Sequence, residues 1–92
     1  MEATGELSLG QVVSSKAGRD KDRLFIVVDI LDDQYVLIAD GDLRKIEKPK
    51  KKKVKHLLIQ NTIHAEIKEK LEKNQKIDNI YLRRELEKLG II

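Results

Sequence analysis

The sequence contains no cysteine, no tryptophan and only one proline. Without cysteine the chain can form neither a disulfide nor a thiolate metal site, and this composition fits a reducing compartment. No apolar stretch approaches the roughly 20 residues that a membrane-spanning helix needs. The first ten residues lack the basic start and the apolar segment of a secretory signal. We therefore expect a cytoplasmic protein that has no membrane partner.

Aromatic residues are also scarce, and Phe25, Tyr35 and Tyr81 are the only three. The hydrophobic fraction of 40% is therefore almost entirely aliphatic, which suits a β-rich module with helical additions. So few aromatic rings argue against recognition of nucleic acid by base stacking. With 92 residues the chain has room for one small domain with one compact core.

The sequence does contain a dense block of positive charge. The twelve residues from Arg44 to Lys55, which we call the basic block, include eight Lys or Arg residues and a single acid, Glu47. By contrast, residues 1–43 carry four basic against nine acidic side chains, and residues 62–92 carry seven against six. A block of this density indicates a polyanionic partner. RNA is the leading candidate, and charge alone leaves DNA or an acidic protein open.

Short apolar runs between turn residues predict about five strands. The β-branched run 24–30 is typical of a strand that is buried on both faces. Pro49 has no N–H, so the tract around it is expected at a sheet edge or in a loop. Five short strands joined by tight turns predict a small barrel, because closure removes exposed edges. The remaining strands are expected at 9–14, 35–39, 43–46 and 54–59.

Beyond residue 60 the hydrophobic period changes to that of helices. Thr62 is the expected N-cap of a first helix, in which Ile67 and Leu71 follow Ile63 at four-residue spacing. Asp78 is expected to cap a second helix that ends at Gly90 and carries the stripe Leu82, Leu86 and Leu89. The connection between them is short, which predicts an antiparallel helical hairpin.

Acidic and histidine side chains are common components of catalytic and metal sites, and the sequence contains several of them. Five aspartates stand near the expected strand ends, where turn chemistry accounts for them: Asp29, Asp32, Asp33, Asp40 and Asp42. Neither His56 nor His64 has a second histidine or a cysteine at metal-ligand spacing. No phosphate-binding glycine loop or nucleophile motif is present. We therefore expect no enzyme activity, no metal and no cofactor.

Three consecutive segments, Gly10–Val13, Ala17–Lys21 and Phe25–Val28, follow the order of a KOW motif: strand, glycine-bearing loop, strand. Together with Tyr35–Gly41 and Val54–Leu57, they resemble the KOW-type large-subunit ribosomal proteins of archaea and eukaryotes and their small bacterial relatives. The resemblance covers about half of the chain. It implies an SH3-like barrel that binds ribosomal RNA or a ribosome-associated RNA, without catalysis.

Carried over by position, the resemblance makes Gly18 the structural glycine of the KOW loop. Two positions depart from the family pattern, since Asp22 stands where the loop often has glycine and Lys53 where asparagine is common. The predicted RNA-binding residues are Arg19, Lys21, Arg44, Lys45, Lys48, Lys50, Lys51, Lys52, Lys53, Lys55 and His56.

These observations predict a mainly β protein in three parts: a flexible N-terminus at 1–8, an SH3-like KOW barrel at 9–60, and a helical hairpin at 61–92 that packs on or beside the barrel. The predicted function is RNA binding, with the ribosome as a possible partner. The alternative is a protein–protein interaction module that uses the barrel or the helical hairpin. In that case the hairpin would offer an apolar face composed of Ile77, Ile80, Ile91 and Ile92.

Overall fold

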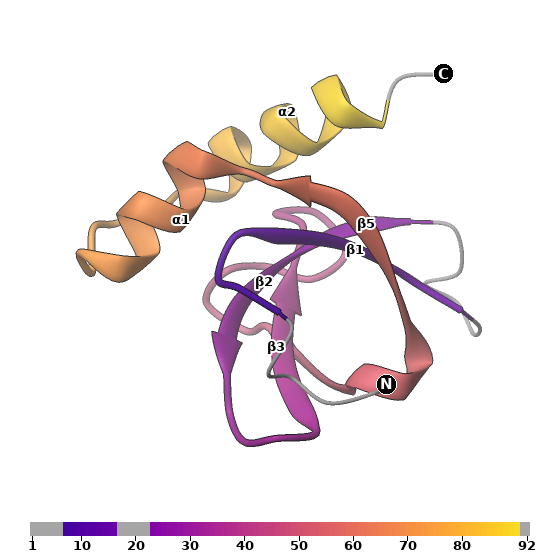
Figure 1. Cartoon of the computed structure of the whole chain (residues 1–92). Helices are drawn as coiled ribbons and strands as arrows, with labels where there is room; N and C mark the ends of the chain where they lie inside the picture. Colours follow the sequence, from indigo (N-terminus) through magenta and orange to yellow (C-terminus); the bar gives the residue numbers. More distant parts are fainter. Residues whose placement is uncertain (1–6, 17–22, 91–92) are drawn as a thin grey trace.

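A computed structural model of the protein describes residues 7–16 and 23–90, which form a five-stranded antiparallel sheet followed by two helices (Figure 1). The predicted mainly β fold is therefore confirmed. The strands lie in the order β4-β3-β2-β1-β5. The elements are β1 (Gln11–Ser15), β2 (Leu24–Ile30), β3 (Tyr35–Ala39), β4 (Lys50–Lys53), the 3-10 helix η2 (Val54–His56), β5 (Leu57–Ile63), α1 (Ala65–Glu72) and α2 (Asn79–Leu89).

The central strands are apolar on both faces because each face of the curled sheet covers a separate hydrophobic cluster. Val13 and Phe25 belong to the inner cluster, which η2 closes with Val54. The neighbouring Val12 and Ile26 point the other way and pack in an outer cluster beneath the helices. Figure 1 shows both helices on this one side of the sheet. The buried members of the outer cluster are Val12, Ile26, Ala39, Ile67, Ile77, Leu82 and Leu86.

The N-terminal segment contributes to the inner cluster as well. Leu7, which the sequence analysis placed in the flexible lead-in, is only 8% exposed and packs with the inner cluster. The chain then turns at Gly10, whose amide donates to the carbonyl of Val27 at 2.9 Å. Gly10 adopts a φ of +83°, a left-handed conformation that glycine tolerates without strain. The hydrophobic core of the sheet thus begins before β1.

The predicted fourth strand at 43–46 is wrong, and the strand forms instead from the lysines of β4. Residues 43–46 have other backbone partners: Asp40 accepts the amide of Arg44 at 2.8 Å, and Asn79 accepts the amide of Ile46 at 2.8 Å. β4 pairs with β3 on one side and is an edge strand of the sheet. A strand at an edge needs no continuous apolar face, so four lysines are compatible with it.

The predicted strand at 54–59 and the predicted helix start at Thr62 are also displaced. Residues 54–56 form η2, and β5 extends through Thr62 to Ile63, which pairs with Gln11. The N-cap of α1 is His64, whose Nδ1 accepts the amide of Ile67 at 3.1 Å. The pairing of β5 with β1 is interrupted by a β-bulge between the pairs Gln11–Ile63 and Val13–Ile59. In this bulge the side chain of Gln11 replaces a backbone partner, since its Nε2 donates to the carbonyl of Gln60 at 2.7 Å.

The second helix agrees with the sequence-based expectation. Asp78 caps α2 by accepting the amide of Tyr81 at 2.7 Å, and Gly90 is the C-cap of the helix. Leu82 and Leu86 are buried, whereas Leu89 is exposed. The helices run antiparallel, as shown by contacts that pair His64 with Glu85 and Glu66 with Tyr81. Within the described part of the chain, neither helix combines the length and the apolar character that crossing a membrane requires.

Candidate nucleic-acid interface

The centre of the basic block forms one edge of the sheet. Lys50, Lys51, Lys52 and Lys53 make up the whole of β4, and we call their four side chains the lysine edge. Hydrogen bonds to β3 hold the backbone of these residues in an extended conformation. The cationic side chains are therefore displayed at fixed positions along a strand. Lysines on an edge strand also discourage pairing with a further strand.

The lysine edge has an outer face that carries one aromatic ring. Lys53 lies opposite Tyr35 and Lys51 opposite Leu37, so these side chains share the face of the sheet on which the helices pack. The Nζ atom of Lys51 lies 4.6 Å from the centroid of the Tyr35 ring, and that of Lys53 lies 5.7 Å from it. Both distances are in the range of a cation–π interaction. Tyr35 was not among the predicted site residues, because its proximity to the lysines depends on the pairing of β3 with β4.

The other two lysines lie on the inner face of the sheet. Lys50 is paired with Ile38 and Lys52 with Val36, and both apolar partners are fully buried in the inner cluster. Lys50 and Lys52 are themselves half-buried. Long lysine stems can cover apolar surface while the ammonium group stays in water. These two side chains thus protect the edge of the core as well as carrying charge.

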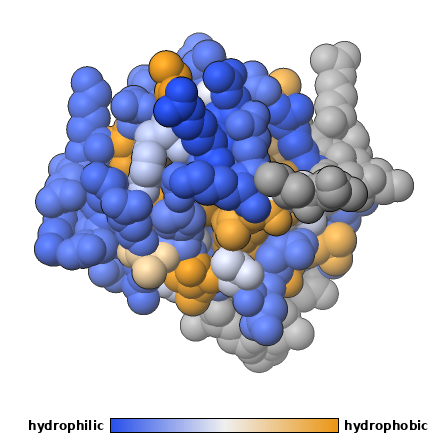
Figure 2. All heavy atoms as spheres, turned by 90° about the horizontal axis from the view of Figure 1, so that it is seen from above, coloured by the Kyte–Doolittle hydropathy of each residue, from blue (hydrophilic) through white to orange (hydrophobic). Residues whose placement is uncertain are grey.

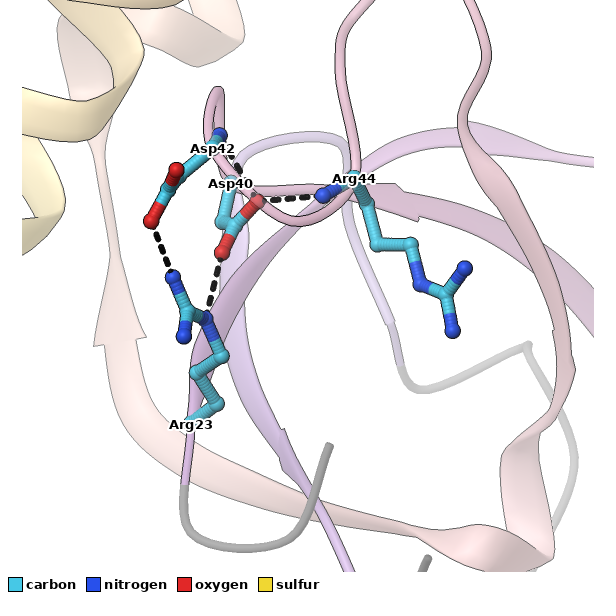
Figure 3. Close-up of polar contacts among 4 residues, drawn as sticks. All are labelled: Arg23, Asp40, Asp42 and Arg44. Carbon is cyan, nitrogen blue, oxygen red and sulfur yellow. Dashed lines mark hydrogen bonds and ion pairs between the residues drawn. The ribbon is translucent and has the colours of Figure 1, made fainter. Parts of the chain in front are cut away.

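A network around Asp40 fixes the turn from which the basic block begins (Figure 3). Asp40 is 4% exposed and accepts hydrogen bonds from Nε of Arg23 at 2.8 Å, from the amide of Asp42 at 3.0 Å and from the amide of Arg44 at 2.8 Å. The hydrogen bond to Asp40 raises the pKa of the Arg23 guanidinium above its usual value. The half-buried side chain of Arg44 points away from both carboxylates (Figure 3).

Helix α2 holds the segment between this turn and β4. The single acid of the basic block, Glu47, accepts both hydrogen bonds that Nδ2 of Asn79 donates, at 2.9 and 3.0 Å. These bonds lower the pKa of Glu47 below its usual value. Gly41 lies so close to α2 that an added Cβ would clash with the carbonyl oxygen of Asn79. The basic block is therefore attached to α2 at its start and to β3 at its centre.

The end of the basic block contacts the end of β1. Lys16 donates from its backbone amide to the carbonyl of His56 at 3.0 Å and from its Nζ to the carbonyl of Lys55 at 2.9 Å. This contact adds Lys16 to the cations of the region, a residue that the sequence analysis did not select. Three predicted residues, Gly18, Arg19 and Lys21, lie outside the described residues. The predicted RNA-binding residues Lys45, Lys48, Lys55 and His56 are all exposed.

The apolar face expected on the helical hairpin is not present as predicted. Ile77 is 6% exposed and packs in the outer cluster, so it cannot belong to a docking face. Ile80 is 58% exposed. Ile91 and Ile92 lie outside the described residues. The exposed apolar side chains of β5, namely Leu58, Ile59 and Ile63, were not among the predicted docking residues. Leu58 and Ile59 fall within the predicted strand at 54–59, whereas Ile63 lies beyond its predicted end.

Two of the five aspartates near the predicted strand ends, Asp32 and Asp40, accept turn hydrogen bonds as predicted. Oδ1 of Asp32 accepts the amides of Gln34 and Tyr35, and Oδ1 of Asp29 accepts the amide of Ile30. Within residues 7–16 and 23–90, no three histidine or acidic side chains form a group that could hold a metal ion.

The fold and the lysine edge together define a small mainly β domain with a fixed cationic surface. No family model matches the sequence. The chain is 30% identical over 73 residues to a Bacillus subtilis (strain 168) protein named "Putative ribosome-binding protein YbzG". The match covers 79% of this chain and 99% of that protein. The chain therefore belongs to the family of this Bacillus subtilis protein.

Proposed function

We propose that this protein associates with the ribosome by binding ribosomal RNA through the lysine edge. The observation that carries the proposal is a strand of four consecutive lysines at the edge of a sheet. The name of the Bacillus subtilis relative, which describes ribosome binding, supports the choice of partner. The resemblance of residues 9–60 to KOW-type ribosomal proteins agrees with it. Such a role is one of binding without catalysis, and it would place the protein in the cytoplasm.

The fold holds four positive charges in place along β4. Two like charges about 4 Å apart repel by about 1 kcal/mol in water. Hydrogen bonds between β4 and β3 keep the four lysines adjacent in spite of this repulsion. Phosphates relieve the repulsion, and the counterions that they release on binding add a favourable entropy. The lysine edge is therefore suited to a polyanion.

Neighbouring basic residues extend this surface on both sides of β4. Arg44, Lys45 and Lys48 precede β4, and Lys55 and His56 follow it. Lys16, which directly follows β1, lies beside these last two residues. Contacts of this kind fix the position of a protein on a nucleic acid without reading its sequence. Folded RNA is recognised mainly by shape and backbone. We therefore propose structured ribosomal RNA as the ligand, with Arg19 and Lys21 as additional contacts from the KOW-like loop.

The test replaces Lys50, Lys51, Lys52 and Lys53 by Gln and measures binding to purified ribosomes and to ribosomal RNA across a salt series. With about four or five neutralised phosphates, the slope of log K against log[salt] should be near −3 to −4 for the unmodified protein. The variant should bind more weakly and with a flatter slope. A matched control replaces four lysines outside the basic block, Lys68, Lys70, Lys73 and Lys76. If the β4 variant binds as tightly as the unmodified protein, the proposal is wrong.

The alternative function, a protein-interaction module, has one structural observation in its favour. β5 forms the opposite edge of the sheet, and Leu58, Ile59 and Ile63 on it are 45–48% exposed. On the face that Figure 2 shows, hydrophobic residues reach the surface among hydrophilic ones. A pull-down with and without RNase separates the two functions. A partner that survives RNase and is lost when Leu58 and Ile59 are replaced by Lys would favour the interaction module.

A further inference from the structure

We infer that Tyr35, Lys51 and Lys53 form a seat for one unpaired nucleotide of the bound RNA. This inference rests on the proposed function and specifies the RNA: a strand with at least one accessible base, in place of a continuous duplex. The base would stack on the Tyr35 ring, and the two lysines would bind the phosphates on either side of it. Recognition would then combine a charged backbone contact with one aromatic platform.

The location of Tyr35 distinguishes it from the other tyrosine. Its ring lies within 6 Å of two ammonium groups on the lysine edge, at 4.6 and 5.7 Å. Tyr81 also has a lysine near its ring, Lys70 at 5.7 Å, but its hydroxyl donates to Glu66 at 2.6 Å and it packs against the outer cluster. Tyr81 therefore has a structural role between the helices. Tyr35 is the aromatic residue that the fold brings to the basic block.

The backbone around Tyr35 is held firmly, so the ring is a prepared platform. The amide of Tyr35 donates to Oδ1 of Asp32 at 2.9 Å, and its carbonyl accepts the amide of Leu31 at 3.0 Å. The preceding residue, Gln34, accepts the amide of Val54 at 2.8 Å, which ties the hairpin to η2. Little backbone ordering is then needed when a ligand binds, and this lowers the cost of binding.

When the nucleotide binds, its base takes the place of the lysine ammonium groups at the face of the Tyr35 ring. An ammonium group and a nucleobase both bind to the face of an aromatic ring. Residues i and i+2 of a strand lie about 6.6 Å apart on one face, comparable to the separation of neighbouring phosphates in a nucleic acid strand. Lys51 and Lys53 can therefore leave the ring for the two phosphates that flank a stacked base. A base inside a duplex is paired and stacked on its neighbours, so it cannot reach Tyr35.

Scarcity of aromatic residues argued against base stacking at the level of composition. The structure changes that conclusion, because one ring is enough for one base when two cations lie close to it. The same scarcity makes the seat easy to observe, since the chain has no tryptophan and only two tyrosines.

The first experiment measures the affinity of three variants for a short oligouridylate and for a blunt RNA duplex of the same length. Tyr35→Leu should lower the affinity for the single strand about ten-fold and that for the duplex less than about two-fold. Tyr35→Phe keeps the ring and should bind both RNAs within about two-fold of the unmodified protein. Tyr81→Phe is the control outside the basic block and should also change neither. Equal effects of Tyr35→Leu on both RNAs, or no effect on either, overturn the inference.

The second experiment does not depend on the folding of Tyr35→Leu. In the Tyr81→Phe protein, Tyr35 is the sole remaining tyrosine, and its fluorescence should be quenched when the oligouridylate saturates the protein. Unchanged fluorescence at saturation overturns the inference. If replacement of the four β4 lysines abolishes binding while Tyr35→Leu does not affect it, the proposed function stands and the nucleotide seat is wrong. If that lysine variant binds normally, the proposed function itself fails.

Discussion

The Nε2 atom of His64 lies 2.8 Å from Oε1 of Glu85, and this contact joins the start of α1 to the middle of α2. Nδ1 of the same ring accepts the amide of Ile67, so Nε2 carries the proton and donates to the carboxylate. One side chain thus caps a helix and links it to its neighbour. Because His64 follows β5 directly, it also fixes where the sheet ends and the helical pair begins.

His64→Ala should destabilise the protein by about 1–2 kcal/mol, because it removes both the N-cap acceptor of α1 and the partner of Glu85. A domain of this size should then melt several degrees lower, at about 4–8 °C per kcal/mol. Thermal unfolding followed by circular dichroism measures the change. His64→Asn restores a capping oxygen without the contact to Glu85, and it should recover about half of the loss. Equal melting temperatures for His64→Ala and the unmodified protein would contradict this role.

The stability contributed by Glu85 should depend on pH. Hydrogen bonds from Lys88 and His64 lower the pKa of Glu85 below its usual 4.5. A carboxylate whose pKa is lower in the folded than in the unfolded state stabilises the fold at pH values above its unfolded pKa. This stabilisation is lost as the pH falls through the pKa of the folded state. Glu85→Gln should therefore lower the melting temperature near neutral pH, and the difference should disappear in acid. Glu87→Gln, an exposed site on the same helix, is the control and should show no such dependence.

The fold class was predictable because the residues of the core strands are by themselves typical of buried strands. β2 and β3 agree with the predicted 24–30 and 35–39, since continuous apolar runs mark strands that are buried on both faces. β4 was missed because Lys50–Lys53 has no hydrophobic pattern; its extended conformation comes from pairing with β3. The helix start was misplaced because Thr62 is the commoner capping residue, whereas His64 caps through a contact that only the folded chain creates.

The positive charge of the candidate site was predictable from the sequence, but the spatial arrangement of its side chains was not. The basic block is visible as a count of lysines, and the sequence therefore indicated a polyanion. The division of those lysines between two faces, and the position of Tyr35 among them, follow from the register of β3 with β4. Register depends on contacts between segments that are distant along the chain, so composition and periodicity could not supply it.

Asp40→Ala should destabilise the protein by about 2 kcal/mol or more, because it leaves the amides of Asp42 and Arg44 without their acceptor and removes the buried partner of Arg23. Chemical denaturation measures the free energy of unfolding. The side chain of Asp42 is 52% exposed and pairs with the same arginine. Asp42→Ala is therefore the matched control and should cost less than about 1 kcal/mol. Similar losses in both variants would show that the turn does not depend on Asp40.

The two faces of the lysine edge should contribute unequally to RNA binding, although each carries two of its four charges. Lys51 and Lys53 share the outer face with Tyr35, while Lys50 and Lys52 lie opposite buried residues of the inner cluster. Replacing Lys51 and Lys53 by Gln should reduce the magnitude of the salt slope by about 1.4–1.8, since each lost phosphate contact removes about 0.7–0.9. Replacing Lys50 and Lys52 by Gln removes the same charge and should change the slope less. Equal slopes for the two double variants would mean that RNA responds to the total charge of β4, and that the face on which a lysine lies has no influence.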